Sequence, residues 1–340
     1  MVPSSAPPYR VVVIDFLKDD LSPERQVLGN LAEIVALNAQ SVEELPGQIE
    51  EADALMMYHY LEMQQKTLSL LKKCRLIVRC GVGYDNVDIQ AAKELNIPVA
   101  NIPDYGTEEV ADAAIGLSLD LLRKISFLNR HLQRSRDDWH YQVALPIRRL
   151  RGLKCGVVGC GRIGTAFAIR AKALGLEVQF YDPDLPDGYD KAIGVDRCDT
   201  LEELLESSDL VSLHCPLTET TREMINSETI ALMKSGSHLV NTARGSIVDH
   251  RAVLKALESG KLAGAALDVL EEEPPRNDDP VLEAWRDPNH PAHYRLILNP
   301  HSAFYSLESL HDMRTKGAEN IRRVLTDLPA RNVINGVQSI

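Results

Sequence analysis

Short apolar runs alternate with helical patterns of apolar residues along most of the chain. This alternation is typical of α/β domains built around a parallel sheet. Helical patterns at residues 64–74 and 88–95 lie between apolar runs in the first third of the chain. This part of the sequence therefore predicts a small doubly wound domain. Its strands are expected at residues 9–15, 53–59, 76–81 and 97–102.

The pattern then changes. Residues 107–135 keep helical periodicity and predict one long helix that could join two domains. A polar segment with a tryptophan follows at residues 136–152. A second series of apolar runs predicts six strands, which is the number in a complete dinucleotide-binding sheet. These strands are expected at residues 155–159, 177–182, 210–216, 238–245, 264–270 and 295–301.

Two of the helices in the second series have recognisable ends. One has Asn226 or Ser227 as its N-cap and Gly236 beyond its last turn. The other begins at Asp249 and stops at Gly260. We expect the last helical pattern of the chain to cross back to the first domain.

Composition restricts the kinds of partner. The chain has 340 residues, of which 44% are hydrophobic and 25% charged, as in soluble globular proteins of two domains. Its net charge of −12 argues against electrostatic binding to nucleic acid or to anionic membranes. The apolar runs are shorter than the roughly 20 residues that span a bilayer. The basic cluster of Arg148, Arg149 and Arg151 is more typical of a solvated surface or a subunit contact. We therefore predict no direct nucleic-acid or membrane partner.

The cysteines and the first ten residues indicate the compartment. None of the six cysteines forms a C-x-x-C pair, and several lie in apolar runs. Buried, reduced side chains fit this pattern better than a zinc site does. Residues 1–10 lack a basic segment followed by an apolar stretch, so we expect a frayed tail and no secretory signal. These features predict a cytoplasmic protein without a metal site.

Residues 159–164 read Gly-Cys-Gly-Arg-Ile-Gly, the G-x-G-x-x-G pattern of a dinucleotide-binding turn. An apolar strand precedes the pattern, a helical run follows it, and the next strand ends in Asp182, as the fingerprint requires. Gly159 permits the tight turn, Gly161 lets the backbone approach a pyrophosphate, and Gly164 lets helix and strand pack closely. The N-terminus of the helix offers N–H groups to the phosphates. Asp182 can accept hydrogen bonds from both ribose hydroxyls and would repel a 2′-phosphate, so we predict NAD(H) rather than NADP(H). A purely structural glycine turn is the alternative.

Four polar residues follow successive strands of the second series: Arg244, Asp268, Glu273 and His301. Ligands of open α/β sheets bind beyond the carboxyl ends of the strands, so we expect these residues to converge on one crevice. Reduction of a 2-keto acid needs a proton donor that titrates near neutral pH, which suits histidine, and a carboxylate would hold its ring. An arginine can bind the substrate carboxylate with two hydrogen bonds. Each residue alone would more often be structural. Their joint placement predicts that Arg244, Glu273 and His301 are catalytic.

Over about residues 75–330, the sequence resembles the D-isomer-specific 2-hydroxyacid dehydrogenase family. The matching stretches are GCGRIG, FYDPD, LHCPLTETT, NTARGSIVD, GAALDVLEEEP and NPHSA, in the family's order. The resemblance implies that Arg244, Glu273 and His301 form the catalytic set and that Asp268 contacts the nicotinamide. Formate dehydrogenases of the same superfamily have glutamine at the position of Glu273, so formate is not the expected substrate.

The resemblance also assigns binding residues. In the family, backbone N–H groups of the loop matching RCGVGYDNVD bind the substrate carboxylate. The predicted substrate-binding residues are Val82, Gly83, Arg244, His301 and Phe304. The predicted cofactor-binding residues are Gly159, Gly161, Arg162, Ile163, Gly164, Asp182, Cys215, Pro216, Thr221, Thr242, Ala243 and Asp268.

Within the family, the stretches LHCPL and PHSAFYSLES are most similar to the C-terminal-binding-protein (CtBP) branch, which includes corepressors that bind NAD(H). That branch usually has tryptophan at the position of Phe304, so this chain leaves different room for a substrate. His59 either faces the substrate crevice or is an ordinary buried or surface histidine. Family members usually dimerise through the cofactor domain, which implies a homodimer formed by an arm near residues 107–150.

The expected fold is α/β, with two doubly wound parallel-sheet domains. A Rossmann NAD-binding domain at 104–304 is inserted in a smaller flavodoxin-like substrate domain at 1–103 and 305–340. The predicted function is NAD(H)-dependent interconversion of a small D-2-hydroxy acid and its 2-keto acid, with His301 as the acid/base. The alternative is a CtBP-like dimeric protein that senses NAD(H) and binds other proteins with little turnover. A nuclear location would accompany that alternative in a eukaryote.

Overall fold

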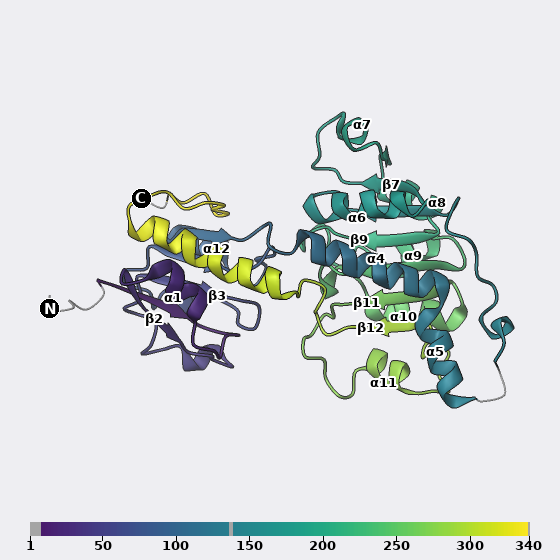
Figure 1. Cartoon of the computed structure of the whole chain (residues 1–340), viewed down its shortest axis with the longest axis horizontal. Helices are drawn as coiled ribbons and strands as arrows, with labels where there is room; N and C mark the ends of the chain where they lie inside the picture. Colours follow the sequence, from purple (N-terminus) through teal and green to yellow (C-terminus); the bar gives the residue numbers. More distant parts are fainter. Residues whose placement is uncertain (1–7, 136–138, 339–340) are drawn as a thin grey trace. The chain divides into compact units, whose positions relative to one another are not determined.

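A computed structural model describes residues 8–135 and 139–338. Of the tail predicted at residues 1–10, residues 1–7 lie outside this part, and Tyr9 already belongs to the first strand. The chain forms two compact units, Met1–Gly106 together with Ser306–Ile340, and Thr107–Tyr305. Both units are α/β with parallel sheets (Figure 1).

The first unit is built on five parallel strands in the order β2-β1-β3-β4-β5, the flavodoxin-like arrangement. The central strands β3 and β4 are buried along their whole length, as expected for a sheet covered on both faces. The first helix and β2 were not predicted from the sequence. β2 is a short, partly exposed edge strand without a continuous apolar run, so it gives no clear strand signal. The strands are β1 (Tyr9–Val13), β2 (Ala32–Ala36), β3 (Ala54–Met57), β4 (Leu76–Arg79) and β5 (Val99–Asn101). The helices are α1 (Ser22–Leu28), α2 (Gln65–Leu68), α3 (Ile89–Glu94) and α12 (Leu307–Leu325), with a 3₁₀ turn η1 (Val42–Glu44).

The last long helix, α12, completes the first unit, as we predicted from the pattern (Figure 1). Arg314 on this helix makes two hydrogen bonds to Glu24 of α1, both of 2.7 Å. Arg314 is 5% exposed and Glu24 is fully buried. The same guanidinium also contacts Asp19, which precedes α1. A buried ion pair therefore joins the two ends of the chain within one unit.

The second unit is built on seven parallel strands in the order β12-β11-β10-β9-β6-β7-β8. Counted from β6, this is the Rossmann order 3-2-1-4-5-6 with β12 added at one edge. The order reverses between β6 and β9, which makes this the switch point where ligands of such sheets bind. The strands are β6 (Lys154–Val158), β7 (Glu177–Tyr181), β8 (Asp196–Arg197), β9 (Leu210–Leu213), β10 (Ser237–Asn241), β11 (Leu262–Leu267) and β12 (Leu296–Leu298).

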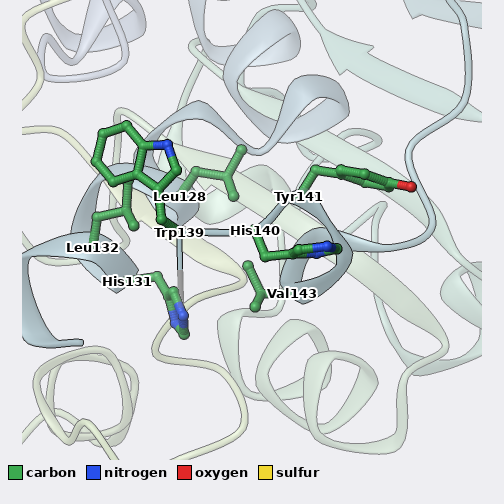
Figure 2. A pocket seen from close by; sticks show the side chains of 7 residues that line it. All are labelled: Leu128, His131, Leu132, Trp139, His140, Tyr141 and Val143. Atoms are coloured by element: carbon green, nitrogen blue, oxygen red, sulfur yellow. The ribbon is translucent and has the colours of Figure 1, made fainter. Parts of the chain in front are cut away.

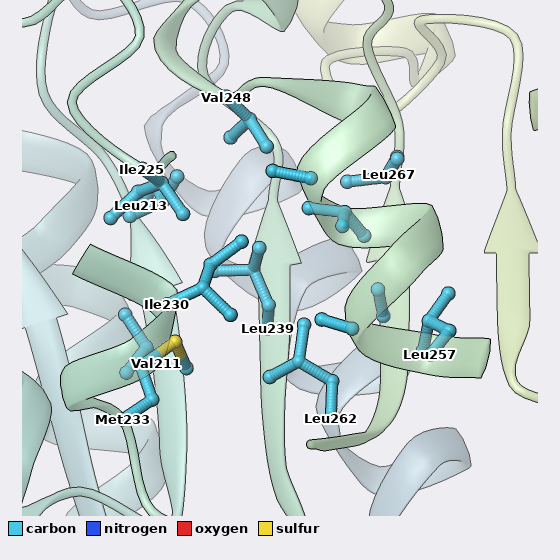
Figure 3. Packing of buried hydrophobic residues seen from close by; sticks show 14 of the residues in the cluster. Val211, Leu213, Ile225, Ile230, Met233, Leu239, Val248, Leu257, Leu262 and Leu267 are labelled. Carbon is cyan, nitrogen blue, oxygen red and sulfur yellow. The ribbon is translucent and has the colours of Figure 1, made fainter. Parts of the chain in front are cut away.

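Helices cover both faces of this sheet. α4 and α6 pack on one face, and α8, α9 and α10 on the other, where leucine, valine and isoleucine side chains interdigitate between helices and strands (Figure 3). The helices are α4 (Thr107–Arg123), α5 (Ile125–Arg134), α6 (Arg162–Ala173), α7 (Tyr189–Ile193), α8 (Leu201–Ser207), α9 (Ser227–Leu232), α10 (His250–Ser259) and α11 (Pro280–Arg286). Two 3₁₀ turns are η2 (Tyr141–Ala144) and η3 (Gly245–Ile247).

Some local predictions were wrong. The long helix expected at 107–135 is two helices, because Lys124 adopts a left-handed conformation with φ 53°. Asp120 accepts the backbone N–H of Ser126 and so caps the start of the second helix. The short edge strand β8 was not anticipated. α9 begins after its N-cap Asn226, as predicted, but ends before Gly236 is reached. The helix from Asp249 to Gly260 is confirmed, with both caps.

Candidate active site

The carboxyl ends of β10, β11 and β12 are tied together beyond the strands themselves. The backbone N–H of Asp268 donates to Asn241 O at 2.9 Å, and that of Asn299 donates to Leu267 O at 3.0 Å. The N–H of His301 donates to Asp268 O at 2.7 Å. The segments after these three neighbouring strands therefore lie along one edge of the sheet in a fixed register.

His301 and Glu273 form a hydrogen-bonded pair at this edge. Nδ1 of His301 lies 2.6 Å from Oε2 of Glu273, and both side chains are partly exposed. The other carboxylate oxygen, Oε1, accepts the backbone N–H of Leu270 at 2.8 Å. The glutamate is thus held by its own loop while it orients the imidazole. With Nδ1–H donated to Glu273, Nε2 is the ring atom that can exchange a proton with a ligand.

Asp268 shapes the turn that presents His301. His301 has a left-handed backbone with φ 50°, which is uncommon for a residue other than glycine. Asp268 is 1% exposed, and its two carboxylate oxygens accept the N–H groups of Ser302 and Ala303 at 3.0 Å each. The carboxylate of Asp268 thus binds the two residues after His301, while its backbone carbonyl binds the N–H of His301 itself. The predicted nicotinamide contact of Asp268 stays a prediction.

Arg244 follows β10, in a loop that the buried side chain of Asn241 holds. Nδ2 of Asn241 donates to Arg244 O at 2.8 Å, and its Oδ1 accepts Ala243 N–H at 3.0 Å. A Cβ on Gly245 would lie 1.9 Å from the carbonyl carbon of Leu270, so this turn packs against the loop that carries Glu273. Only glycine permits that approach. Asn241 is not among the residues predicted from the sequence, although its place at the start of NTARG is a signal for a loop-holding role.

Phe304 lies beside the histidine. Its ring is edge-on to that of His301, with 6.1 Å between the centroids. The side chain is partly exposed, so it can form a wall for a ligand that contacts His301.

The glycines at 159–164 have three different structural roles. Gly159 has φ 84°, and a Cβ there would lie 2.6 Å from Cys215 N. A Cβ on Gly164 would lie 2.0 Å from Gly159 O, so helix α6 approaches the turn closely. A Cβ on Gly161 would meet no described protein atom within 4 Å. The fold itself therefore requires the first and third glycines, whereas the second leaves space for a ligand.

That space suits a pyrophosphate. Gly161 is the N-cap of α6 and has no side chain that could bind the first N–H groups of the helix. Gly161 and Arg162 are exposed at this helix N-terminus, and Ile163 is partly buried. A helix start of this kind binds anions through its N–H groups. Oγ1 of Thr242 is buried and has no hydrogen-bond partner within the described residues, which provides a polar group for a bound cofactor.

Asp182 directly follows β7, beside this turn. Its Oδ2 accepts the N–H of Cys160 at 2.8 Å, and its Oδ1 accepts the N–H of Asp184 at 3.0 Å. The carboxylate is thereby fixed at the position where a ribose is expected. Of the other predicted cofactor residues, Cys215 and Pro216 follow β9, and Thr221 Oγ1 donates to Pro216 O at 2.7 Å. Ala243 lies in the Asn241 loop.

Val82 and Gly83, the predicted carboxylate-binding residues, lie in the first unit after β4. Asn101 Nδ2 donates to Val82 O at 2.7 Å, which fixes the loop from the neighbouring strand β5. His59 contacts the rings of Phe16 and Tyr60, with centroids 5.4 and 4.5 Å away. Its predicted alternatives therefore stay open.

Four of the six cysteines are buried, and Cys74 and Cys215 are partly buried. The six cysteines are free thiols, and burial raises the pKa of Cys155 and of Cys215 to about 12. Within residues 8–135 and 139–338, no three His, Cys, Asp or Glu side chains gather so that they could hold a metal ion. No helix in the same ranges is long and apolar enough to cross a membrane.

Known proteins resemble this chain over most of its length. Residues 115–303 match the family described as "D-isomer specific 2-hydroxyacid dehydrogenase, NAD binding domain", which assigns an NAD(H)-binding domain to the chain. The chain is 35% identical to C-terminal-binding protein 1 of Caenorhabditis elegans over 330 residues, 95% of this chain and 44% of that protein. It is 36% identical to D-3-phosphoglycerate dehydrogenase of Methanocaldococcus jannaschii over 326 residues, 96% of this chain and 59% of that enzyme. The chain thus spans about half the length of these curated relatives.

A solved structure agrees. D-lactate dehydrogenase of Aquifex aeolicus, crystallised with NAD and lactic acid, superposes with a TM-score of 0.82 at 29% identity, covering 93% of this chain and 96% of that one. The parallel sheets, the glycine turn and the family match together lead to one conclusion: the chain belongs to the D-isomer-specific 2-hydroxyacid dehydrogenase family.

Proposed function

We propose that the protein is an NAD(H)-dependent oxidoreductase that interconverts a D-2-hydroxy acid and its 2-keto acid. The single observation that supports this most directly is the His301–Glu273 pair, with its 2.6 Å hydrogen bond, at the ligand-binding edge of an NAD-binding sheet. A structural histidine would not need a partly exposed position in a strained turn that a buried aspartate holds.

Each residue has a proposed task in the reduction of a keto acid. When bound, NADH supplies the hydride. The imidazolium of His301 gives its proton from Nε2 to the carbonyl oxygen, and Glu273 keeps the ring oriented through Nδ1. The positive charge of Arg244 binds the substrate carboxylate and stabilises charge that develops on the oxygen. In the oxidation direction His301 takes the proton back.

The remaining assignments follow the same proposal. Backbone N–H groups of Val82 and Gly83 bind the substrate carboxylate, and Phe304 limits the size of the substrate side chain. Asp182 favours NAD(H) over NADP(H), because its carboxylate accepts hydroxyl hydrogen bonds and repels a phosphate.

The test is NADH oxidation by the purified protein against 2-keto acids that range from glyoxylate to phenylpyruvate, with NADPH in parallel. We expect turnover of at least one acid with NADH. His301→Ala should reduce kcat at least about a hundredfold, in keeping with loss of a general acid. Glu273→Gln should reduce it less, because the imidazole stays in place.

A second histidine–carboxylate pair provides the matched control. Nε2 of His290 lies 3.2 Å from Glu258 Oε1 in the same unit, between the end of α10 and the segment before β12. His290→Ala removes a similar pair at the amino ends of the strands and should leave turnover unchanged. Full activity in His301→Ala, or equal losses in both variants, would contradict the assignment.

The 35% identity to C-terminal-binding protein 1 favours a second candidate. In that case NAD(H) binding regulates association with other proteins, and turnover is slow. Tight NADH binding without turnover of any acid in the panel, together with NADH-dependent binding of a protein partner, would support this candidate over the first.

We also propose that the chain forms a homodimer through α5 and the segment after it. None of the ten residues of α5 is buried. Trp139 and Tyr141 are 84% and 70% exposed, and with Leu128 and Leu132 they line a pocket of about 220 Å³ (Figure 2). Two exposed aromatic side chains beside partly exposed leucines are typical of an interface. Residues 136–138 of the predicted arm lie outside the described part of the chain.

Light scattering on the purified protein tests the dimer. We expect twice the chain mass for the parent protein and a lower dimer stability for Trp139→Ala. Leu328→Ser, at a leucine that is 45% exposed in the other unit, is the control and should leave the mass unchanged. A monomer at micromolar concentration would contradict the proposal.

A further inference from the structure

The loop after β7 carries the residue that contacts the ribose in the proposed cofactor site. Asp182 is its first residue, and α7 and β8 follow it. β8 pairs with β7 over only two residue pairs, at the edge of the sheet. The strand ladder therefore gives this loop little support, and other contacts must fix its conformation.

Arg197, on β8, supplies those contacts. Its Nη2 donates to Asp182 O at 2.9 Å and to Leu185 O at 3.0 Å, and its Nη1 donates to Pro186 O at 3.2 Å. The guanidinium carbon also lies 5.8 Å from the ring centroid of Phe180. One guanidinium thus holds three carbonyl groups of a single loop, a geometry that its planar set of donors permits and an ammonium does not.

The arginine acts on the same residue whose carboxylate faces the glycine turn. Arg197 binds the carbonyl oxygen of Asp182, while the carboxylate of Asp182 accepts N–H groups from Cys160 and Asp184. The backbone and the side chain of Asp182 are therefore fixed from two sides. Because the charge of Arg197 is directed at carbonyl groups, it is not presented to a ligand phosphate.

We propose that Arg197 is a positioning residue that sets the preference for NAD(H) over NADP(H). It keeps Asp182 where the carboxylate accepts the 2′-hydroxyl of the ribose and repels a 2′-phosphate. The inference rests on the proposed cofactor site and adds to it a determinant that touches no part of the cofactor. Without the guanidinium, the loop relaxes, the hydroxyl contact weakens, and the repulsion of a phosphate falls.

Calorimetric titration with ADP-ribose and with 2′-phospho-ADP-ribose tests this without any turnover. In Arg197→Met the Kd for ADP-ribose should rise about tenfold, or about 1.4 kcal/mol, and the Kd for the phosphorylated ligand should not rise. The ratio of the Kd for 2′-phospho-ADP-ribose to the Kd for ADP-ribose, which measures the preference for the unphosphorylated ligand, then falls about tenfold. Arg197→Lys should give an intermediate ratio, because an ammonium can hold only part of the loop. If Arg197 has a purely structural role, its replacement should weaken the binding of both ligands equally and leave this ratio unchanged. That result would overturn the proposal.

Two further variants separate the possible causes. Arg295→Met removes a comparable arginine-to-carbonyl bond, to Leu257 O at 2.8 Å, at the amino end of β12, and should leave the ratio unchanged. Asp182→Asn should lower the ratio, and adding Arg197→Met to it should lower the ratio no further, since the arginine acts through Asp182. Fully additive effects would overturn the proposal. If the parent protein binds neither ADP-ribose nor NADH, the proposed cofactor site itself is wrong.

Discussion

The buried ion pair between Arg314 and Glu24 allows a quantitative prediction about the first unit. Replacement of Arg314 by methionine leaves the fully buried Glu24 carboxylate without its two 2.7 Å hydrogen bonds. Removal of one partner of such a pair typically costs about 3–5 kcal/mol, because the remaining charge cannot be solvated. The contact to Asp19 adds little, since the Asp19 side chain is 51% exposed and screened by water.

The second unit provides an internal reference for the measurement. Both tryptophans, Trp139 and Trp285, belong to it. We therefore expect Arg314→Met to accelerate amide hydrogen exchange in β1 and β3 by about a hundredfold or more, which corresponds to about 3 kcal/mol. The denaturant midpoint measured by tryptophan fluorescence should change far less.

The double variant Arg314→Met/Glu24→Leu tests whether the instability comes from the lost hydrogen bonds or from a buried carboxylate left without a partner. It removes both charges and should recover most of the lost protection, because an apolar pair of similar volume can replace a buried ion pair. Asp19→Asn should cost less than about 1 kcal/mol. A loss under about 1 kcal/mol in Arg314→Met, or a double variant as unstable as the single one, would refute the reasoning.

Three other predictions concern the second unit. Gly161→Ala should weaken NADH binding at least about tenfold at unchanged stability, whereas Gly164→Ala should lower the denaturant midpoint, because its Cβ would lie 2.0 Å from a backbone oxygen; equal stability losses would contradict this. Burial lowers the pKa of His214 from 6.5 to about 3, so between these pH values only the unfolded chain binds the proton. Protonation of His214 in the unfolded chain should therefore lower the free energy of unfolding by about 2 kcal/mol from pH 7 to pH 5. In urea titrations, His214→Asn should remove this part of the pH dependence; an unchanged pH dependence would show that His214 is not its source. Asn241→Ala should lower kcat/KM for the keto acid at least about tenfold, because the Arg244 loop loses two hydrogen bonds, with a much smaller change in the Kd for NADH; equal changes in both would argue for general damage instead.

Features with a local cause were predicted well. Helix α10 lies between its N-cap Asp249 and its C-cap Gly260. Both ends were predictable because a side-chain cap and a left-handed glycine act within one turn of the helix. The buried strands of both sheets were found because continuous apolar runs mark them. The two-residue strand β8 has no such signal, and the break at Lys124 depends on a conformation that no residue type requires. These errors concern places where neighbouring elements override local preference.

The sequence suggested candidate site residues, but not the side chains that hold their loops in place. His301, Glu273 and Arg244 could be named because each is a reactive group at the end of an apolar run. The sequence did not indicate that the carboxylate of Asp268 holds the turn after His301. For Asn241, which holds the loop of Arg244, its place at the start of NTARG was the only signal. Hydrogen bonds between loops depend on the order of the strands, which only the folded sheet fixes.

By itself, therefore, the sequence determined two parallel-sheet domains and the glycine turn, since periodicity and short motifs act over a few residues. It also predicted which residues move a proton or bind a carboxylate. The tertiary structure decided which of those residues meet. Glu273 and His301 are 28 residues apart and become one pair because β11 and β12 are neighbours. Glu24 and Arg314, 290 residues apart, become another because the chain returns to its first unit. The sequence specifies which charged groups are present. Their interaction depends on the distance between them, and the fold sets that distance to a few ångströms.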